Sequence, residues 1–396
     1  MKAKYPKIYL SIDNCFASKR WTRPRDWMKV ISECDIHYVE ASADNECDPL
    51  YMDDAYLISW TNEIQKYAPE YQIDIANLYS GHGTYSTLGL AHTDPRNADK
   101  MLFGWLYRMV STAWELNCGL GFYCHAFDQA TLQSPECYQT AQNDLTERLS
   151  ILAERAGKLK IPSIGVEQMY TPHQIPWRID GAKQLLKNIR RESGCDFYLT
   201  IDTGHQCGQH KFLRPGRMEL QRAISTFQKS GRFDGIWLGP EKIYTMIRNG
   251  SSIDDLEKAL ADYSYLFSEK RDSDVYEWLR ELAPYSPVIH LQQTDGKRSA
   301  HLPFNETNNR NGIITGEKVL SAIAEAYERP EEEGMPKWCE AIYLTLEIFA
   351  GTADLPMDIE YKIKDSVAYW RQFVPQDGLI LEVNSKVINN RHDMGI

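Results

Sequence analysis

The sequence predicts an α/β protein whose strands and helices alternate and close into a (β/α)8 barrel, or TIM barrel. Short apolar runs alternate with amphipathic stretches of helical length at intervals of about 30–40 residues up to Asp202. Polar residues with catalytic or metal-binding potential stand at the ends of several of these runs, where such barrels keep their active sites. Neither a GxGxxG motif nor a P-loop follows the first run, which disfavours an open nucleotide-binding sheet.

The first half of the chain supplies four strand–helix units. Each strand is inferred from a run rich in apolar and aromatic residues, such as KIYLSI, and each helix from its amphipathic spacing. A glycine-rich segment, SGHGTYSTLGLAHTDP, follows the third strand and is long enough to be a functional loop. The expected strands are 7–12, 36–41, 72–78 and 119–125, and the expected helices are 24–33, 52–67, 95–117 and 137–157.

The fifth unit has the clearest pattern. Its apolar strand, 161–166, ends directly before Glu167, and Pro172 and Pro176 interrupt the chain before an amphipathic helix at 177–193. The remaining strands are expected to end at Asp202 and to span 287–292 and 341–346, with helices near 216–229, 316–327 and 358–374.

The regular spacing lapses once, between Asp202 and His290. The segment 203–289 holds 87 residues, far more than one helix needs, so we expect a helical insertion at about 230–285, between strands 6 and 7. The last residues, about 375–396, are expected to be a C-terminal extension. The whole chain, 1–396, is otherwise predicted to be a single barrel domain.

Composition excludes some classes of partner. The net charge of −11 disfavours a nucleic-acid or anionic-membrane surface, because phosphate binding needs clustered Lys and Arg. No apolar run approaches the roughly 20 residues of a membrane-spanning helix, and the first residues lack a signal-peptide pattern. Nine scattered cysteines without a CxxC pair are typical of a reducing compartment. We therefore expect a cytoplasmic protein.

Four strand ends carry candidate metal ligands. Glu167, Asp202, His290 and Glu347 follow the fifth to eighth predicted strands, and mixed carboxylate and imidazole ligation suits Mn²⁺, Co²⁺, Mg²⁺ or Zn²⁺. A single acidic residue after a strand is often only a solvated loop residue. Four such groups at consecutive strand ends predict one divalent metal site.

Other polar residues are candidates for the substrate pocket. His205 follows Asp202 in IDTGH and can reach a substrate oxygen, although Asp202 as a helix cap beside a surface histidine is the alternative. His125 and Glu40 end strands and are candidate pocket residues, with core packing as the alternative for His125. Arg298, with its neighbours Lys297 and His301, follows the seventh strand, where barrels often bind phosphate; solvated loop charges are the alternative.

The motifs VEQMYTP…P, IDTGH, VIHLQQTDG…H and LTLEIF, in this order, resemble the xylose-isomerase-like TIM-barrel superfamily of sugar and sugar-phosphate isomerases and epimerases. The resemblance rests on motifs over about 160–350 and on the strand–helix rhythm before that. It implies one divalent metal, Mn²⁺ above all, bound by Glu167, Asp202, His290 and Glu347. It also implies a substrate contact from His205 and assembly into a homo-oligomer, a dimer or tetramer.

Two positions depart from the pattern of this superfamily. Many of its ketose epimerases have a Glu six residues after the first metal ligand, where this chain has His173. They also tend to have an Arg six residues after the metal-binding His, where this chain has Gly296, with Arg298 nearby. Both positions contact substrate in such enzymes, so His173 and Arg298 are candidate substrate contacts and the identity of the sugar stays open.

These inferences predict a metal-dependent isomerase or epimerase of a small ketose or ketose phosphate. A bound metal would stabilise a cis-enediolate, and Glu167 and Glu347 would act as the two acid/base groups. The same chemistry also serves a lyase, a dehydratase or decarboxylase of a keto-sugar or keto-acid, which is the alternative. The negative charge disfavours a DNA-repair endonuclease of the endonuclease-IV type. The complete ligand set disfavours a non-catalytic sugar-binding barrel.

Overall fold

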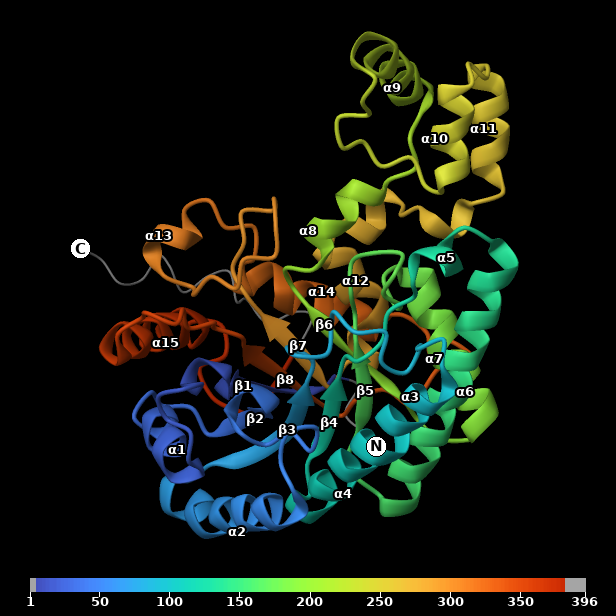
Figure 1. The fold of residues 1–396 in the computed structure, drawn as a ribbon. Helices are drawn as coiled ribbons and strands as arrows, with labels where there is room; N and C mark the ends of the chain where they lie inside the picture. Colours follow the sequence, from blue (N-terminus) through green and yellow to red (C-terminus); the bar gives the residue numbers. More distant parts are fainter. Residues whose placement is uncertain (1–4, 382–396) are drawn as a thin grey trace, which may run out of the picture.

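A computed structural model describes residues 5–381 and shows a closed parallel barrel (Figure 1). Strands β1 to β8 pair in sequence order, and β1 pairs with both β2 and β8, which closes the barrel. A short strand, β9, adds to β1 in antiparallel orientation. The strands are β1 Lys7–Asp13, β2 Tyr38–Ser42, β3 Asp74–Ser80, β4 Gly119–Phe122, β5 Ile164–Glu167, β6 Tyr198–Asp202, β7 Val288–Leu291, β8 Ala341–Leu346 and β9 Leu379–Ile380.

Helices surround the barrel, and the predicted (β/α)8 fold is confirmed (Figure 1). The helices are α1 Pro24–Ser32, α2 Asp54–Tyr71, α3 Pro95–Asp99, α4 Tyr107–Leu116, α5 Gln129–Leu132, α6 Pro135–Leu159, α7 Ile179–Ser193, α8 Gln206–Gln209, α9 Arg217–Ser230, α10 Glu241–Arg248, α11 Ile253–Ala261, α12 Val275–Leu282, α13 Glu306–Asn309, α14 Gly316–Glu328 and α15 Pro356–Trp370.

The alternation of side chains along the strands decides which residues enter the barrel. In β1, Ile8, Leu10 and Ile12 are fully buried in the hydrophobic core that joins the strands to the helices. Tyr9 and Asp13 lie on the other face, inside the barrel. The register then places inward polar residues side by side, because Asp13 is level with Glu40.

Helix ends follow local sequence signals. Helix α6 begins where the Ser134 side chain accepts a hydrogen bond from the backbone of Cys137, with Pro135 in the first turn. Helix α7 ends at Gly194, whose φ of 66° lies in the left-handed region that glycine adopts without a steric penalty. The predicted helix 95–117 is one continuous stretch in three parts, α3, a π-helical segment η3 (Lys100–Leu106) and α4.

The long segment between β6 and β7 is arranged differently from the prediction. Helices α9, α10 and α11 contact one another and project from the barrel, whereas α12 packs against α7 and α14 in the helical layer (Figure 1). Helix α9 buries only Leu220 and Ala223, but α12 buries a larger apolar face that includes Trp278. The sixth barrel helix is therefore α12 and not the predicted helix near 216–229. The predicted insertion of about 230–285 begins too late, because α9 projects with α10 and α11, and ends too late, because α12 belongs to the barrel.

Two further sequence expectations bear on the ends of the chain and on membranes. The start of the expected C-terminal extension contains β9, and 382–396 lie outside the described residues. Within the described part of the chain, 5–381, no helix combines the length and the apolar character needed to cross a membrane.

Candidate functional site

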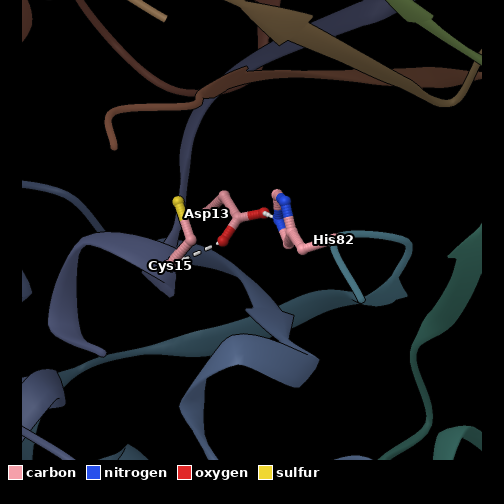
Figure 2. A group of neighbouring side chains, drawn as sticks. All are labelled: Asp13, Cys15 and His82. Atoms are coloured by element: carbon pink, nitrogen blue, oxygen red, sulfur yellow. Dashed lines mark hydrogen bonds and ion pairs between the residues drawn. The ribbon is translucent and has the colours of Figure 1, made fainter. Parts of the chain in front are cut away.

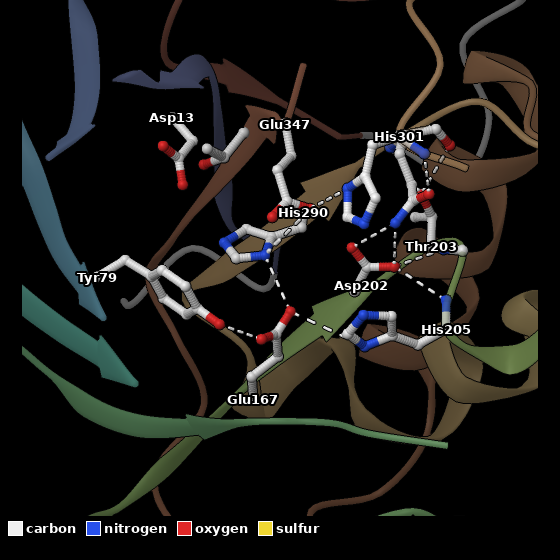
Figure 3. Close-up of polar contacts among 12 residues, drawn as sticks. Asp13, Tyr79, Glu167, Asp202, Thr203, His205, His290, His301 and Glu347 are labelled. Carbon is white, nitrogen blue, oxygen red and sulfur yellow. Dashed lines mark hydrogen bonds and ion pairs between the residues drawn. The ribbon is translucent and has the colours of Figure 1, made fainter. Parts of the chain in front are cut away.

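The four predicted metal ligands converge at the carboxyl end of the barrel (Figure 3). His290 of β7 lies between two glutamates, with its Nδ1 atom 3.1 Å from Glu167 Oε1 and 3.8 Å from Glu347 Oε2. Asp202 of β6 is level with His290 in the sheet register. All four side chains are buried. Because parallel strands end together, residues up to 180 positions apart, from 167 to 347, form one cluster.

A hydrogen-bond chain orients the His290 ring. Its Nε2 atom lies 2.5 Å from Glu40 Oε1, and Asn77 Nδ2 donates to Glu40 Oε2 at 2.5 Å. Glu40 is fully buried, and burial raises the pKa of its carboxyl against the opposing effect of His290. The structure places Glu40 behind the imidazole, where it turns Nδ1 toward Glu167 and Glu347, and the substrate contact predicted for Glu40 stays a prediction.

Glu167 is fixed from two sides. The Tyr79 hydroxyl donates a hydrogen bond to Glu167 Oε2, and His205 Nδ1 lies 3.9 Å from Glu167 Oε1 (Figure 3). Burial alone would raise the pKa of Glu167, but His205 and His290 outweigh it, and the net shift is downward. The same His205 Nδ1 donates to the backbone carbonyl of Gln168 at 2.7 Å, so the ring has a defined orientation at the edge of the cluster.

Asp202 accepts hydrogen bonds from three donors. These are the backbone N–H groups of Gly204, at 2.7 Å, and His205, at 2.9 Å, and the side-chain amide of Gln292, at 2.8 Å. Burial opposes ionisation of Asp202, yet His205 and His301 lower the pKa of its carboxyl. Asp202 is therefore a preorganised carboxylate.

The pKa of Glu347, unlike those of Glu167 and Asp202, is raised. Burial raises its pKa well above the ordinary value, and Asp202 and Glu167 add to this shift against the effect of His290. Its Oε2 atom is buried and has no hydrogen-bond partner within residues 5–381. Several buried carboxyl groups beside buried imidazole rings form an arrangement that a divalent cation would stabilise, so these residues fit a metal site.

His301 belongs to the cluster, whereas the sequence indicated it as the last residue of the motif VIHLQQTDG…H and as a neighbour of a phosphate-binding loop, without a role at the metal. Its Nδ1 atom is 3.1 Å from Glu347 Oε2. Ligand atoms of Asp202, His301 and Glu347 all lie within 4.8 Å of one another. The residue follows β7 in an irregular loop, so no strand periodicity indicates where its side chain points. The motif VIHLQQTDG…H, which ends at this histidine, was the available signal.

Three other predicted substrate contacts lie outside the cluster. His125 is fully buried, its Nε2 atom donates to the carbonyl of Ile175 at 2.5 Å, and burial lowers its pKa to about 4. His173 is half-buried and donates from Nδ1 to the carbonyl of Phe127 at 2.7 Å. Arg298 is exposed. The first two histidines hold neighbouring loops together, and the proposed substrate contacts of all three stay predictions.

A second polar group adjoins this site on the β1 side (Figure 2). Asp13, Cys15 and His82 offer ligand atoms within 4.8 Å of one another, and Asp13 lies within the same limit of Glu40 and His290. Asp13 Oδ1 accepts a hydrogen bond from the backbone N–H of Cys15 at 2.6 Å, and its Oδ2 atom is 3.9 Å from His82 Nε2. The polar layer thus extends from β5–β8 around to β1 and the loop after β3.

Comparison with known proteins identifies the fold. No family model matches the chain. A candidate xylose isomerase from Rhodospirillum rubrum superposes with a TM-score of 0.67 at 15% identity, covering 92% of this chain and 98% of that protein. The chain has the xylose-isomerase-like TIM-barrel fold. D-psicose 3-epimerase from Clostridium cellulolyticum shares this barrel, with a TM-score of 0.54, 11% identity and coverage of 93% of this chain and 99% of that enzyme.

One curated relative matches part of this TIM barrel in sequence. D-erythrulose 1-phosphate 3-epimerase from Brucella abortus is 30% identical over 100 residues, which is 25% of this chain and 29% of that enzyme. The match therefore spans less than a third of the relative. The resemblance inferred from the motifs is confirmed at the level of the xylose-isomerase-like fold.

Proposed function

We propose that this protein is a metal-dependent isomerase or epimerase of a small ketose or ketose phosphate. The observation that carries the proposal is the position of the two glutamates. Glu167 Oε1 and Glu347 Oε2 approach the same atom, His290 Nδ1, at 3.1 and 3.8 Å, from strands that lie on different sides of the barrel. The names of the Brucella and Clostridium enzymes, a ketose-phosphate and a ketose 3-epimerase, support this substrate class.

The residues that would hold the metal are Glu167, Asp202, His290 and Glu347. Oxygen and imidazole donors favour a divalent ion such as Mn²⁺, with Co²⁺, Mg²⁺ and Zn²⁺ as alternatives. When bound, such an ion supplies the positive charge that makes the carbon next to a ketone carbonyl acidic enough to lose a proton.

The protein itself would move the proton. Glu167, held by the Tyr79 hydroxyl, takes the proton from the carbon beside the carbonyl, and Glu347 returns a proton from the other side. Return to the opposite face of the same carbon inverts it, which is epimerisation. Return to the former carbonyl carbon, with the proton of the neighbouring hydroxyl passed to the former carbonyl oxygen, converts the ketose into an aldose, which is isomerisation. Burial of both carboxyl groups keeps competing water away from the reacting carbon.

His205 is the proposed direct substrate contact with the strongest structural support. Its ring is buried beside Glu167 and is oriented by the bond to Gln168. Phe349 adds an apolar surface at this end of the barrel, because its side chain remains 39% exposed while its ring packs on His301. A sugar lying between them would meet one polar and one apolar wall, as carbohydrate sites require.

Proton exchange in D₂O tests the proposal. The protein is stripped with a chelator, resupplied with Mn²⁺, and incubated with a panel of ketoses and ketose phosphates while NMR follows the substrate. We expect deuterium to enter beside the carbonyl only when Mn²⁺ is present, and the labelled carbon separates epimerase from isomerase. Loss of water or carbon dioxide from the product would establish the lyase alternative. Tight binding of Mn²⁺ without exchange on any substrate would contradict the proposed isomerase.

A further inference from the structure

The loop after β7 brings a second imidazole to the proposed metal site. His301 Nδ1 and Glu347 Oε2 are 3.1 Å apart, and both atoms are buried. Neither has a hydrogen-bond partner among residues 5–381, although their separation suits one. The N–H and carboxylate directions are therefore not aligned with each other. The two atoms form a close contact between a histidine and a carboxylate without an aligned hydrogen bond, and a cation bound to both would stabilise it.

The same two atoms border the other proposed ligands. Asp202 completes a triad with His301 and Glu347, in which all ligand atoms lie within 4.8 Å of one another. Glu347 Oε2 is in addition 3.8 Å from His290 Nδ1. The Glu347 oxygen thus lies between two Nδ1 atoms, one from strand β7 and one from the loop that follows it.

Contacts on every side hold the His301 ring in place. The ring stacks on Phe349 with centroids 4.0 Å apart and planes 7° from parallel, and its Nε2 atom is 3.3 Å from Ser299 Oγ. The backbone N–H of His301 donates to Gln292 Oε1 at 2.7 Å, and the amide of Gln292 donates to Asp202. Gln292 therefore connects the loop to the carboxylate that the ring faces.

The backbone of His301 is itself in an unfavourable conformation. Its φ is 45°, in the left-handed region that non-glycine residues rarely adopt. Such a conformation persists only where surrounding contacts enforce it, and it is concentrated at functional sites. The contacts of Gln292 and Phe349 enforce it here, and their result is that Nδ1 points into the carboxylate cluster.

We propose that His301 is a fifth protein ligand of the divalent metal, so that two imidazole nitrogens bind the ion. This inference rests on the proposed function, because it concerns the same site. It adds a ligand from an irregular loop to the four supplied by strand ends. A site with two nitrogen and three carboxylate donors also favours Mn²⁺, Co²⁺ or Zn²⁺ over Mg²⁺, since imidazole is a poor ligand for Mg²⁺.

Pulsed electron paramagnetic resonance of the Mn²⁺-loaded full chain tests this inference, because it detects nitrogens bound to the ion. With ¹⁵N-labelled histidine, we expect couplings from two imidazole nitrogens in the unmutated protein and from one in His301→Ala. Calorimetric titration with Mn²⁺ should show affinity at least about tenfold weaker for His301→Ala, since even residues that only support a ligand contribute 10–100-fold. His210→Ala, a change at an exposed histidine, is the matched control and should keep both nitrogens and the original affinity.

The possible outcomes separate this inference from the proposed function. Imidazole couplings that are the same in the unmutated protein and in His301→Ala would overturn the assignment of His301 and would leave the metal-dependent reaction in place. Failure of the unmutated protein to bind Mn²⁺ or any other divalent ion would overturn both. If His301→Ala does not fold, judged by near-ultraviolet circular dichroism, His301→Gln takes its place, and the loss of one imidazole coupling in that variant decides the question.

Discussion

The barrel interior contains two layers of side chains that use the same strands for different purposes. Toward the amino ends, Tyr9, Tyr38 and Tyr343 pack with ring centroids 4.8 to 5.6 Å apart. Toward the carboxyl ends, Glu40 and Glu347 stand two and four residues further along the chain than Tyr38 and Tyr343. Every second residue of a strand points into the barrel, so both layers occupy equivalent backbone positions. They differ only in their side chains.

The two layers have different energetic consequences. Burial raises the pKa of the Tyr343 hydroxyl to about 12, so this side chain is neutral at physiological pH, and the aromatic layer contributes through packing. The carboxyl layer contains buried ionisable groups, whose desolvation opposes folding unless partners or a cation compensate. We therefore expect the carboxyl layer to determine activity and metal affinity and the aromatic layer to determine stability. Substitutions in the aromatic layer should therefore change stability with little effect on metal affinity, and substitutions in the carboxyl layer should change activity and metal affinity with little effect on the aromatic packing.

The largest effect should come from removing either acid/base group. Glu167→Gln and Glu347→Gln keep the size and one oxygen donor of the side chain but cannot transfer a proton, so we expect turnover and deuterium exchange to fall about 10²–10⁴-fold. Turnover should be measured at saturating Mn²⁺, with the bound metal quantified by elemental analysis. Full activity of either variant with metal retained would show that the glutamate is not an acid/base group.

A smaller effect should follow from the residue behind the imidazole. Glu40→Gln retains an acceptor for His290 Nε2 but removes the charge that makes the ring a stronger donor, so Mn²⁺ affinity should fall about tenfold, the lower end of the 10–100-fold usual for such partners. Calorimetric titration measures this. Glu46→Gln, a change at a partly exposed carboxylate in the loop after the same strand, is the control. Equal affinities for Glu40→Gln and the unmutated protein would mean that Glu40 does not tune His290.

The carboxyl layer was largely predictable because it follows strand ends. Glu167, Asp202, His290 and Glu347 each end or follow an apolar run, and parallel strands bring such positions together whatever their sequence separation. The same reasoning recovered all eight barrel strands. It failed for His301, whose position depends on hydrogen bonds to Gln292 and on a left-handed backbone conformation in a loop without periodicity. Loop geometry of this kind is set by tertiary contacts, which a single sequence does not display.

The helical layer shows a different limit. Both 216–229 and VYEWLREL have helical patterns, and the order along the chain favoured the first as the barrel helix. In the structure α12 is the barrel helix. It buries Trp278 and Leu282 against the barrel, whereas α9 buries only Leu220 and Ala223. The sequences alone do not decide between them, because both segments carry several apolar residues at helical spacing. Periodicity indicates that a segment is helical, but it does not indicate which part of the fold the helix packs against.

The smallest effect is expected in the aromatic layer and tests whether the two layers are independent. Tyr343→Leu removes the ring contacts with Tyr9 and Tyr38, at 5.2 and 5.6 Å, and should lower the free energy of unfolding by about 1 kcal/mol, the usual contribution of such aromatic pairs. Urea denaturation of the metal-free protein measures this loss, and Tyr343→Phe, which keeps the ring, should show little of it. Mn²⁺ affinity should not change in either variant. A fall in affinity for Tyr343→Leu would mean that the packing of the barrel floor also sets the position of Glu347, four residues further along β8 and just beyond its end, and that the carboxyl layer is organised through the strand as well as through its own hydrogen bonds.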